Sequence, residues 1–258
     1  MKFGQILKGI APVLAIALAA GVSGCDNAKF SLNGEEGKKL AELDLAGKAP
    51  DELILLSPDE VEIKQGDKLA ITVDGDPEAV AAMRFTLSDK SLGILRGDNS
   101  GWSNDKRAVI RVTMPAPREV IMAGSGKIRA EALAPGASVV VAGSGAIEAA
   151  SVSGDTLEAT LPGSGSFRAA GNVAKLDLTI LGSGSAHLDA VKAETAKVTI
   201  AGSGGAAFAS DGEVEATIMG SGTVTVKGRA RCKVSAMGSG TLVCETPAEQ
   251  TGKAKKPA

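Results

Sequence analysis

The triplet Gly-Ser-Gly occurs seven times in the second half of this 258-residue chain, and its period is the strongest constraint on the fold. The copies begin at Gly124, Gly143, Gly163, Gly182, Gly202, Gly220 and Gly238. A near-constant period of roughly 18–20 residues indicates a stacked repeat, in which each unit covers the apolar side of the unit before it.

Within each repeat, apolar and polar residues alternate with a period of two. The residues two and four positions before the triplet are apolar in every copy, and the second residue after it is apolar as well. This alternation predicts a strand, the triplet, a second strand and a short irregular connection. Helical repeats are excluded because they need ten or more residues with a period of 3.6, and a propeller blade needs about 40 residues.

A parallel β-solenoid is the architecture that fits one turn of this length. We expect an all-β protein built as a single-stranded parallel β-helix of about seven coils, roughly 30 Å long at about 4.8 Å per coil. Repeated corners bring backbones close together, so the paired glycines are expected to be structural turns, with the serine hydroxyls hydrogen-bonding locally or between coils. These glycines are Gly124, Gly126, Gly143, Gly145, Gly163, Gly165, Gly182, Gly184, Gly202, Gly204, Gly220, Gly222, Gly238 and Gly240.

The rest of the chain divides around these repeats. Residues 25–50 are predicted to be a tether with one short strand near Leu43, and residues 246–258 a disordered tail after the 118–245 repeats. Residues 51–117 are expected to cap the solenoid, either as less regular coils or as a small β layer. Trp102 is expected to cover an edge of the core, with an exposed contact role as the alternative. The short strand candidates are 53–56, 61–63, 69–73, 85–87, 92–95 and 109–112.

Residues 1–24 are predicted to be a signal peptide. Two lysines accompany an apolar run from Ile10 to Val22, which is too short to span a bilayer. The run ends in Val-Ser-Gly-Cys, which resembles a bacterial lipoprotein signal and implies cleavage before Cys25 and its acylation. An ordinary signal peptide is the alternative. We expect an exported protein, lipid-anchored to a bacterial membrane and facing the periplasm, with inner and outer membrane both open.

Charge and cysteine content narrow the partners. Cleavage removes Lys2 and Lys8, which takes the net charge from −2 to −4, and no basic patch interleaved with aromatic residues remains. Nucleic acid is therefore not an expected partner. Cys232 and Cys244 fall on inward positions of the last coils, and in an oxidising compartment they are expected to form a disulfide.

Residues with catalytic potential are few. The only histidine, His187, lies on an outward position, where a solvated role is favoured, and we expect no metal or cofactor. Glu158 and Asp177 should stack on adjacent coils about 5 Å apart. They form either a pair suited to polysaccharide cleavage or two solvated carboxylates. The uniform short connections favour a non-catalytic module that binds an envelope protein or glycan.

The repeated triplets, the signal segment, the β-rich segment before the repeats and the step at Met114-Pro115 together resemble the bacterial GIN-domain family. The resemblance covers roughly residues 30–245. It implies a right-handed β-helix on the outer side of a cell membrane, with an adhesin-like role. It supplies no catalytic residues to transfer to this sequence.

Overall fold

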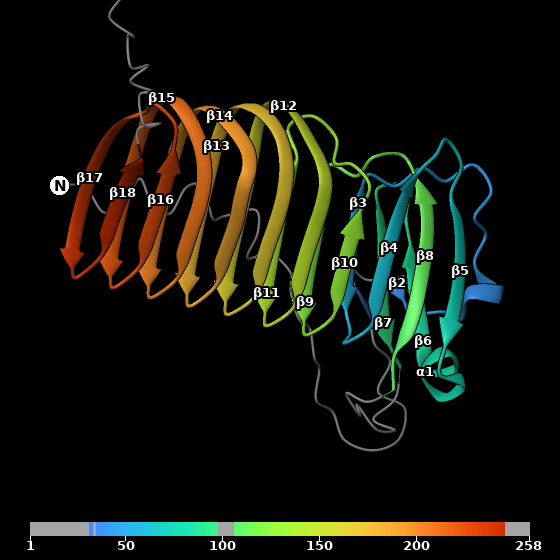
Figure 1. The fold of residues 1–258 in the computed structure, drawn as a ribbon. Coiled ribbons are helices and arrows are strands. Elements are labelled where there is room, and N and C mark those ends of the chain that lie inside the picture. The colour runs from blue at the N-terminus through green and yellow to red at the C-terminus, as the bar shows by residue number, and fades with distance from the viewer. Residues whose placement is uncertain (1–30, 33–34, 98–105, 246–258) are drawn as a thin grey trace, which may run out of the picture.

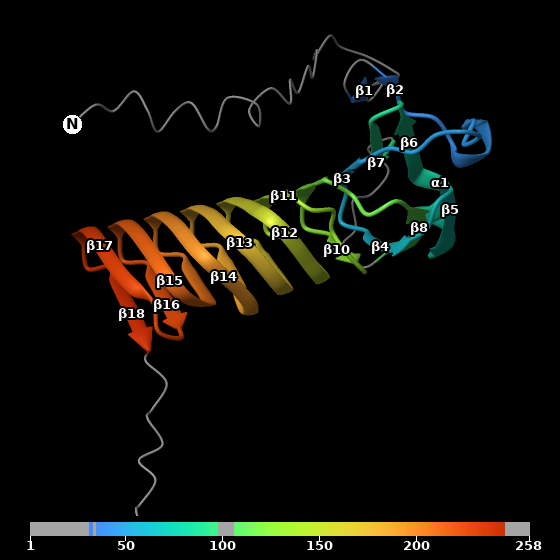
Figure 2. The same cartoon turned by 90° about the horizontal axis from the view of Figure 1, so that it is seen from above.

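The computed structural model describes residues 31–32, 35–97 and 106–245, and they form a β-solenoid closed at one end by a cap (Figures 1 and 2). Strands that precede the triplets stack into one face, and strands that follow them stack into a second face. The coils are parallel and in register, as the period predicts. Cys25, Trp102 and the predicted tail lie outside the described residues.

The first face runs through every strand that ends at a triplet. Its members are β9 (Glu119–Gly124), β11 (Ser138–Gly143), the later parts of β12 (Ala146–Gly163), β13 (Ser166–Gly182), β14 (Ser185–Gly202) and β15 (Gly205–Gly220), and finally β17 (Arg231–Gly238). The second face contains β10 (Lys127–Ala130), the early parts of β12 to β15, β16 (Thr223–Lys227) and β18 (Thr241–Glu245). Equivalent triplet residues pair with each other, for example Gly163 with Gly182.

The connections between repeats are more regular than the sequence suggests. Strands β12 to β15 are long because the chain stays paired with its neighbours through most of each connection. Shifts of register fall within these connections, between Ala149 and Val152 and between Arg168 and Ala170 on the β12–β13 and β13–β14 pairs. The bulges absorb the small differences in length between one repeat and the next.

The core is a narrow apolar column between the two faces. Its inward positions are filled by aliphatic residues and by Phe167 and Phe208, which are fully buried. Ile54, Ile121 and Val140 are neighbours in register on the first face, at positions that alternate along each strand with the inward residues. They form a second, smaller buried cluster. The predicted alternation therefore describes most of the solenoid, although its first outward positions are apolar and buried.

The cap begins with two irregular coils of the same solenoid. One contains β3 (Glu52–Leu56) and β4 (Glu60–Gln65), and the other contains β7 (Ser91–Arg96) and β8 (Ala108–Met114). Strand β3 lies between β9 and β7, and β4 lies between β10 and β8, all in parallel. Of the two alternatives for this segment, less regular coils are what the structure shows here.

The outermost layer of the cap runs in the reverse direction. Strands β5 (Ala70–Gly75) and β6 (Met83–Leu87) pair antiparallel with β8 and β7 and are joined by helix α1 (Pro77–Ala82). The Asp76 side chain accepts hydrogen bonds from the backbone N–H groups of Glu78 and Ala79, so it caps the helix as its position before Pro77 predicts. This layer covers the open edges of β7 and β8.

The segment before the cap differs from its prediction. It contains β1 (Ser31–Leu32), β2 (Glu35–Glu36) and a 3-10 helix at Leu40–Glu42, and there is no strand at Leu43. Lys38 forms the backbone bridge to Phe85 at the edge of β6, and the Leu43 side chain packs against the core instead. The apolar residues of this segment pack against the core with their side chains, and the backbone pairing occurs earlier in the chain, at Lys38.

The two glycines of a triplet are required for different reasons. The first has a positive φ in six copies, as in Gly182 at 128°, and its carbonyl accepts the N–H of Ser203 in the next coil at 3.0 Å. The second lies over an inward side chain of the preceding coil: a Cβ on Gly204 would be 2.5 Å from Cγ2 of Ile180. The triplet serines are exposed, and in the described part their hydroxyls make no hydrogen bond. Their backbone N–H groups, not the predicted hydroxyls, join the coils.

Replacing Gly182 by Ala should cost more stability than replacing Gly184 by Ala. Its φ of 128° is strained for any side chain, and the new Cβ would be 2.6 Å from the carbonyl oxygen of Gly163. A loss of roughly 1–3 kcal/mol is expected at position 182. At Gly184 the nearest atom is 3.0 Å away. Denaturant unfolding of both variants, with Ser183→Ala as the near-neutral control, checks the order. Equal losses would contradict it.

A buried ion pair joins the two parallel cap coils where the Gly-Ser-Gly column ends. Asp59 and Arg96 are 0% and 4% exposed, and Nε of Arg96 donates to Oδ2 of Asp59 at 2.8 Å. Oδ1 of Asp59 accepts the Ala108 N–H at 2.7 Å, and Arg96 also donates to the carbonyl of Lys106 at 2.7 Å. These contacts satisfy both charges, which burial demands. Nothing in the spacing of the sequence predicts this pair.

Replacing Arg96 by Met should destabilise the protein by about 3–5 kcal/mol, because the Asp59 carboxylate would stay buried without its cation. Replacing Arg111 by Met serves as the control. Its ion pair with Asp74 is largely exposed, and such pairs contribute roughly 0–1 kcal/mol. Thermal unfolding of the two variants measures the contrast, and a loss at Arg96 no larger than that at Arg111 would refute the role given to the pair.

Candidate functional site

A shallow cavity of about 370 Å³ lies on the second face and crosses four coils. Six alanines contribute to its lining: Ala130, Ala149, Ala150, Ala169, Ala170 and Ala190. Charged and polar side chains border it: Arg129, Glu148, Arg168, His187 and Asp189. Its volume falls within the range of small-ligand sites, roughly 300–1,000 Å³. It is the candidate site.

The repeat itself builds this hollow. The third residue after each triplet forms an outward column in which Arg129, Glu148, Arg168 and His187 are neighbours in register. The next two positions are Ala149 and Ala150 in one coil and Ala169 and Ala170 in the following coil, where the strands bulge. Alanine extends no further than Cβ, so the surface between the charged column and the bulge is recessed.

Charges around the hollow are unevenly paired. Glu148 is held by Lys127 at 2.8 Å and by Nε of Arg129 at 3.4 Å, and the hydrogen bond from Lys127 is the main cause of its lowered pKa. Arg129 also contacts Glu60. Arg168 lies between Glu148 and His187 in register, yet within the described residues it has no ion pair or hydrogen bond. One guanidinium thus remains available at the middle of the site.

His187 is exposed at the border of the hollow, as its outward position predicts. No hydrogen bond joins it to a triplet serine in the part of the chain that the structure describes. The neighbouring Asp189 is engaged by Lys227 at 2.7 Å, and that hydrogen bond lowers the pKa of Asp189. Among the described residues, the side chains around the hollow include no nucleophile hydrogen-bonded to a base.

Glu158 and Asp177 are neighbours in register on β12 and β13, as expected, but they lie on the first face and away from the hollow. Asp177 is bound by Lys175 at 2.6 Å. The same column continues through Ser138 to Glu119 and Glu52, and together these carboxylates form an acidic edge that extends into the cap. Among the described residues, no three acidic, histidine or cysteine side chains are placed to hold a metal ion.

Two carboxyl groups of the acidic edge have raised pKa values. Burial is the main cause of the raised pKa of Glu52 and of Glu119, and neighbouring carboxylates add to it: Glu119 and Asp51 for the former, Asp51 and Glu158 for the latter. Glu52 could have been found from the sequence, because it precedes the Ser57 corner by the same five positions that separate Glu119 from Gly124.

Replacing Glu119 by Gln should stabilise the protein at neutral pH and lose this effect in acid. The raised pKa means that the fold favours the protonated form, so the stability it provides is present below the ordinary value of 4.5 and disappears as the pH rises through the raised pKa. Thermal unfolding against pH measures the difference from the parent chain. Glu213→Gln should show the opposite sign, because the hydrogen bond from Lys233 lowers the pKa of Glu213. A pH-independent effect at Glu119 would contradict the assignment.

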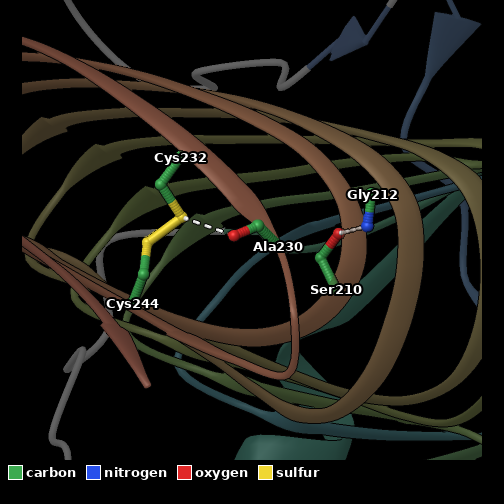
Figure 3. The surroundings of a disulfide bond; sticks show 5 residues. All are labelled: Ser210, Gly212, Ala230, Cys232 and Cys244. Carbon is green, nitrogen blue, oxygen red and sulfur yellow. Dashed lines mark hydrogen bonds between the residues drawn. A yellow bond between two sulfur atoms is a disulfide. The ribbon is translucent and has the colours of Figure 1, made fainter. Parts of the chain in front are cut away.

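The structure joins Cys232 and Cys244 by a disulfide, with the two Cα atoms 6.7 Å apart (Figure 3). The two residues pair in register with Val214 and Val226, which are fully buried inward residues of the preceding coil. The bond therefore links the two faces of the last coil.

Residues 49–230 match the protein family described as "Putative auto-transporter adhesin, head GIN domain". The chain belongs to this family. The match includes the cap and most of the repeats, and it lies within the region of residues 30–245 that resembles the family in sequence. No curated protein matches the sequence.

Solved structures share the GIN-domain fold with this chain. A crystal structure described as a putative adhesin from Bacteroides fragilis has 18% identity and a TM-score of 0.69, covering 77% of this chain and 93% of that chain. One described as a putative lipid binding protein from Parabacteroides distasonis has 21% identity and a TM-score of 0.60, covering 77% and 94%. One described as a putative adhesin from Parabacteroides merdae has 18% identity and a TM-score of 0.57, covering 78% and 98%.

None of the described helices is long and apolar enough to cross a bilayer. The predicted acylation site at Cys25 lies outside the described residues and stays a prediction.

Proposed function

We propose that this GIN-domain protein is an exported, lipid-anchored module of the cell envelope that binds a partner without catalysing a reaction. The observation that carries the proposal is the recess on the second face, where the guanidinium of Arg168 has no partner in the described part and lies beside alanines. The family description as an adhesin head supports a binding role. The sequence around Cys25 supports the anchor.

The chemistry of the recess favours a protein partner. An unpaired guanidinium is suited to a carboxylate, which it binds through parallel hydrogen bonds, and the alanines accept a short aliphatic group. Among the described residues, no Phe or Trp side chain lines the recess, so the described part offers no broad apolar stacking platform for a sugar ring. We therefore infer that an acidic, extended segment of an envelope protein occupies it. A glycan or a fatty acid is the alternative ligand that the binding experiment distinguishes.

Polysaccharide cleavage is the alternative from a different functional class. Glu158 and Asp177 have the register for an acid–nucleophile pair, and β-strand neighbours lie about 4.8 Å apart. However, Asp177 is held by Lys175, and neither carboxylate borders the recess. Hydrolysis of envelope polysaccharide that disappears in both Glu158→Gln and Asp177→Asn would establish this alternative instead.

Binding should depend on Arg168 and on the depth of the recess. The full chain, captured from membranes in detergent, is compared with Arg168→Gln, with Ala170→Leu and with Lys197→Gln, an exposed cation on the other face. Recovery of the bound envelope protein, measured by quantitative mass spectrometry, should fall about tenfold or more for the first two variants, the scale of about 1.4 kcal/mol in affinity. The third variant should match the parent.

The same preparations identify the ligand and the anchor. Retention of a glycan or fatty acid in place of a protein would replace the proposed partner, and equal recovery from all variants would show that the recess is not the site. Cys25→Ser should abolish incorporation of a labelled fatty acid and block processing, so that the chain stays in its precursor form. Label remaining on that variant would refute the anchor alone.

A further inference from the structure

The two ends of the solenoid differ in whether further strands cover them. At the N-terminal end, the reversed strands β5 and β6 cover the parallel coils. At the other end, β17 and β18 each pair on one side only within the described residues (Figure 1). Val234 on β17 is 54% exposed, although its register neighbours in the two preceding coils, Ala216 and Val198, are fully buried. The apolar column thus reaches the end of the molecule uncovered.

The disulfide closes the last coil without covering it. Cys232 and Cys244 connect the faces at this end, while Ala236 and Cys244 remain exposed and Leu242 is only half-buried. The sequence that follows, 246–258, contains no Val, Ile, Leu, Met or aromatic residue that would fill such a site. Unpaired strand edges together with exposed apolar side chains favour association with another chain.

We propose that this end docks against the same end of a second copy of the chain, related by a two-fold axis. An occupant must supply two strand edges and an apolar surface between them. A single donated strand would pair with β17 or with β18, and it would leave the other edge open. A second copy carries both edges and the same apolar surface by construction, which is the condition for a self-complementary contact.

One register of β17 against β18 of the second copy also brings compatible side chains together. If the axis passes through Ser239 at the last corner, it exchanges the two faces and sets β17 antiparallel to β18 of the second copy. Val234 then faces Cys244 and Ala236 faces Leu242 across the contact, so inward positions meet inward positions. On the outward side, Lys233, which also binds Glu213 of its own chain at 3.0 Å, faces Glu245, a pair of opposite charges. The Gly-Ser-Gly column continues from one copy into the other, and no like charges face each other within the described residues.

A cysteine at the axis tests the contact directly. In the full chain expressed in its membrane, Ser239→Cys should give a disulfide-linked dimer on non-reducing gels, because the two copies of this residue meet at the axis. Ser203→Cys is the matched control, at the same exposed triplet position in the middle of the solenoid. We expect at least about tenfold more cross-linked dimer from Ser239→Cys. Equal amounts from both variants would overturn the proposal.

Charge reversal tests the register in the purified full chain. Lys233→Glu and Glu245→Lys should each weaken the dimer in analytical ultracentrifugation, and the double variant should restore it. Val234→Asp should abolish it, while circular dichroism shows that the variant still folds, because this side chain is already more than half exposed. A parent chain that sediments as a monomer at micromolar concentration, or a double variant no better than the single ones, would overturn the proposal.

Discussion

The carbonyl group of the first glycine in each triplet sets the geometry on which the solenoid depends. In one coil after another it accepts a hydrogen bond from the backbone N–H of the serine in the next triplet; the Ser183 N–H, for example, donates to the carbonyl oxygen of Gly163 at 3.0 Å. From Gly143 onward the first glycine has a positive φ, and a Cβ there would lie 2.6 Å or less from the carbonyl oxygen of the first glycine in the preceding coil. Because the corner fixes one coil directly above another, every column of side chains is fixed with it: the apolar core inside, and the charged and small residues outside.

The functional surface is a consequence of those columns. Equivalent positions of successive coils place their side chains about 4.8 Å apart along the molecule. Residues that differ between one repeat and the next therefore lie side by side on the surface. Arg129, Glu148 and Arg168 form such a series, and one acid shared between two arginines leaves one guanidinium without a partner. The recess beside it needs only alanine at two consecutive positions of adjacent repeats.

The sequence was sufficient to predict the repeated coils, but it was insufficient to predict the elements that occur only once. The period predicted the parallel coils, and the six apolar runs before the repeats all appear as strands. The reversed layer of β5 and β6 carries no periodic signal, since it is set by pairing between segments far apart in the chain. The Asp59–Arg96 pair joins two separate cap coils, so no local sequence pattern predicts it. Likewise, the repeat period places Arg129, Glu148 and Arg168 in one outward column, but side-chain geometry decides that Glu148 binds Arg129 and leaves Arg168 available.

The cap and the repeats differ in the length of chain that each contact closes. Among the repeats, each coil pairs with the one directly before it in the chain, so loop closure is short and stacking can proceed locally. The first repeat is different, because β9 pairs with β3, and Glu52 meets Glu119 although most of the cap lies between them in sequence. Strands β5 to β8 are laid down between those two partners in the chain, yet they stack on the far side of β3 and β4. The contact between the cap and the first repeat therefore closes a much longer loop than any contact between successive repeats, and loop closure of this kind carries a larger entropic cost.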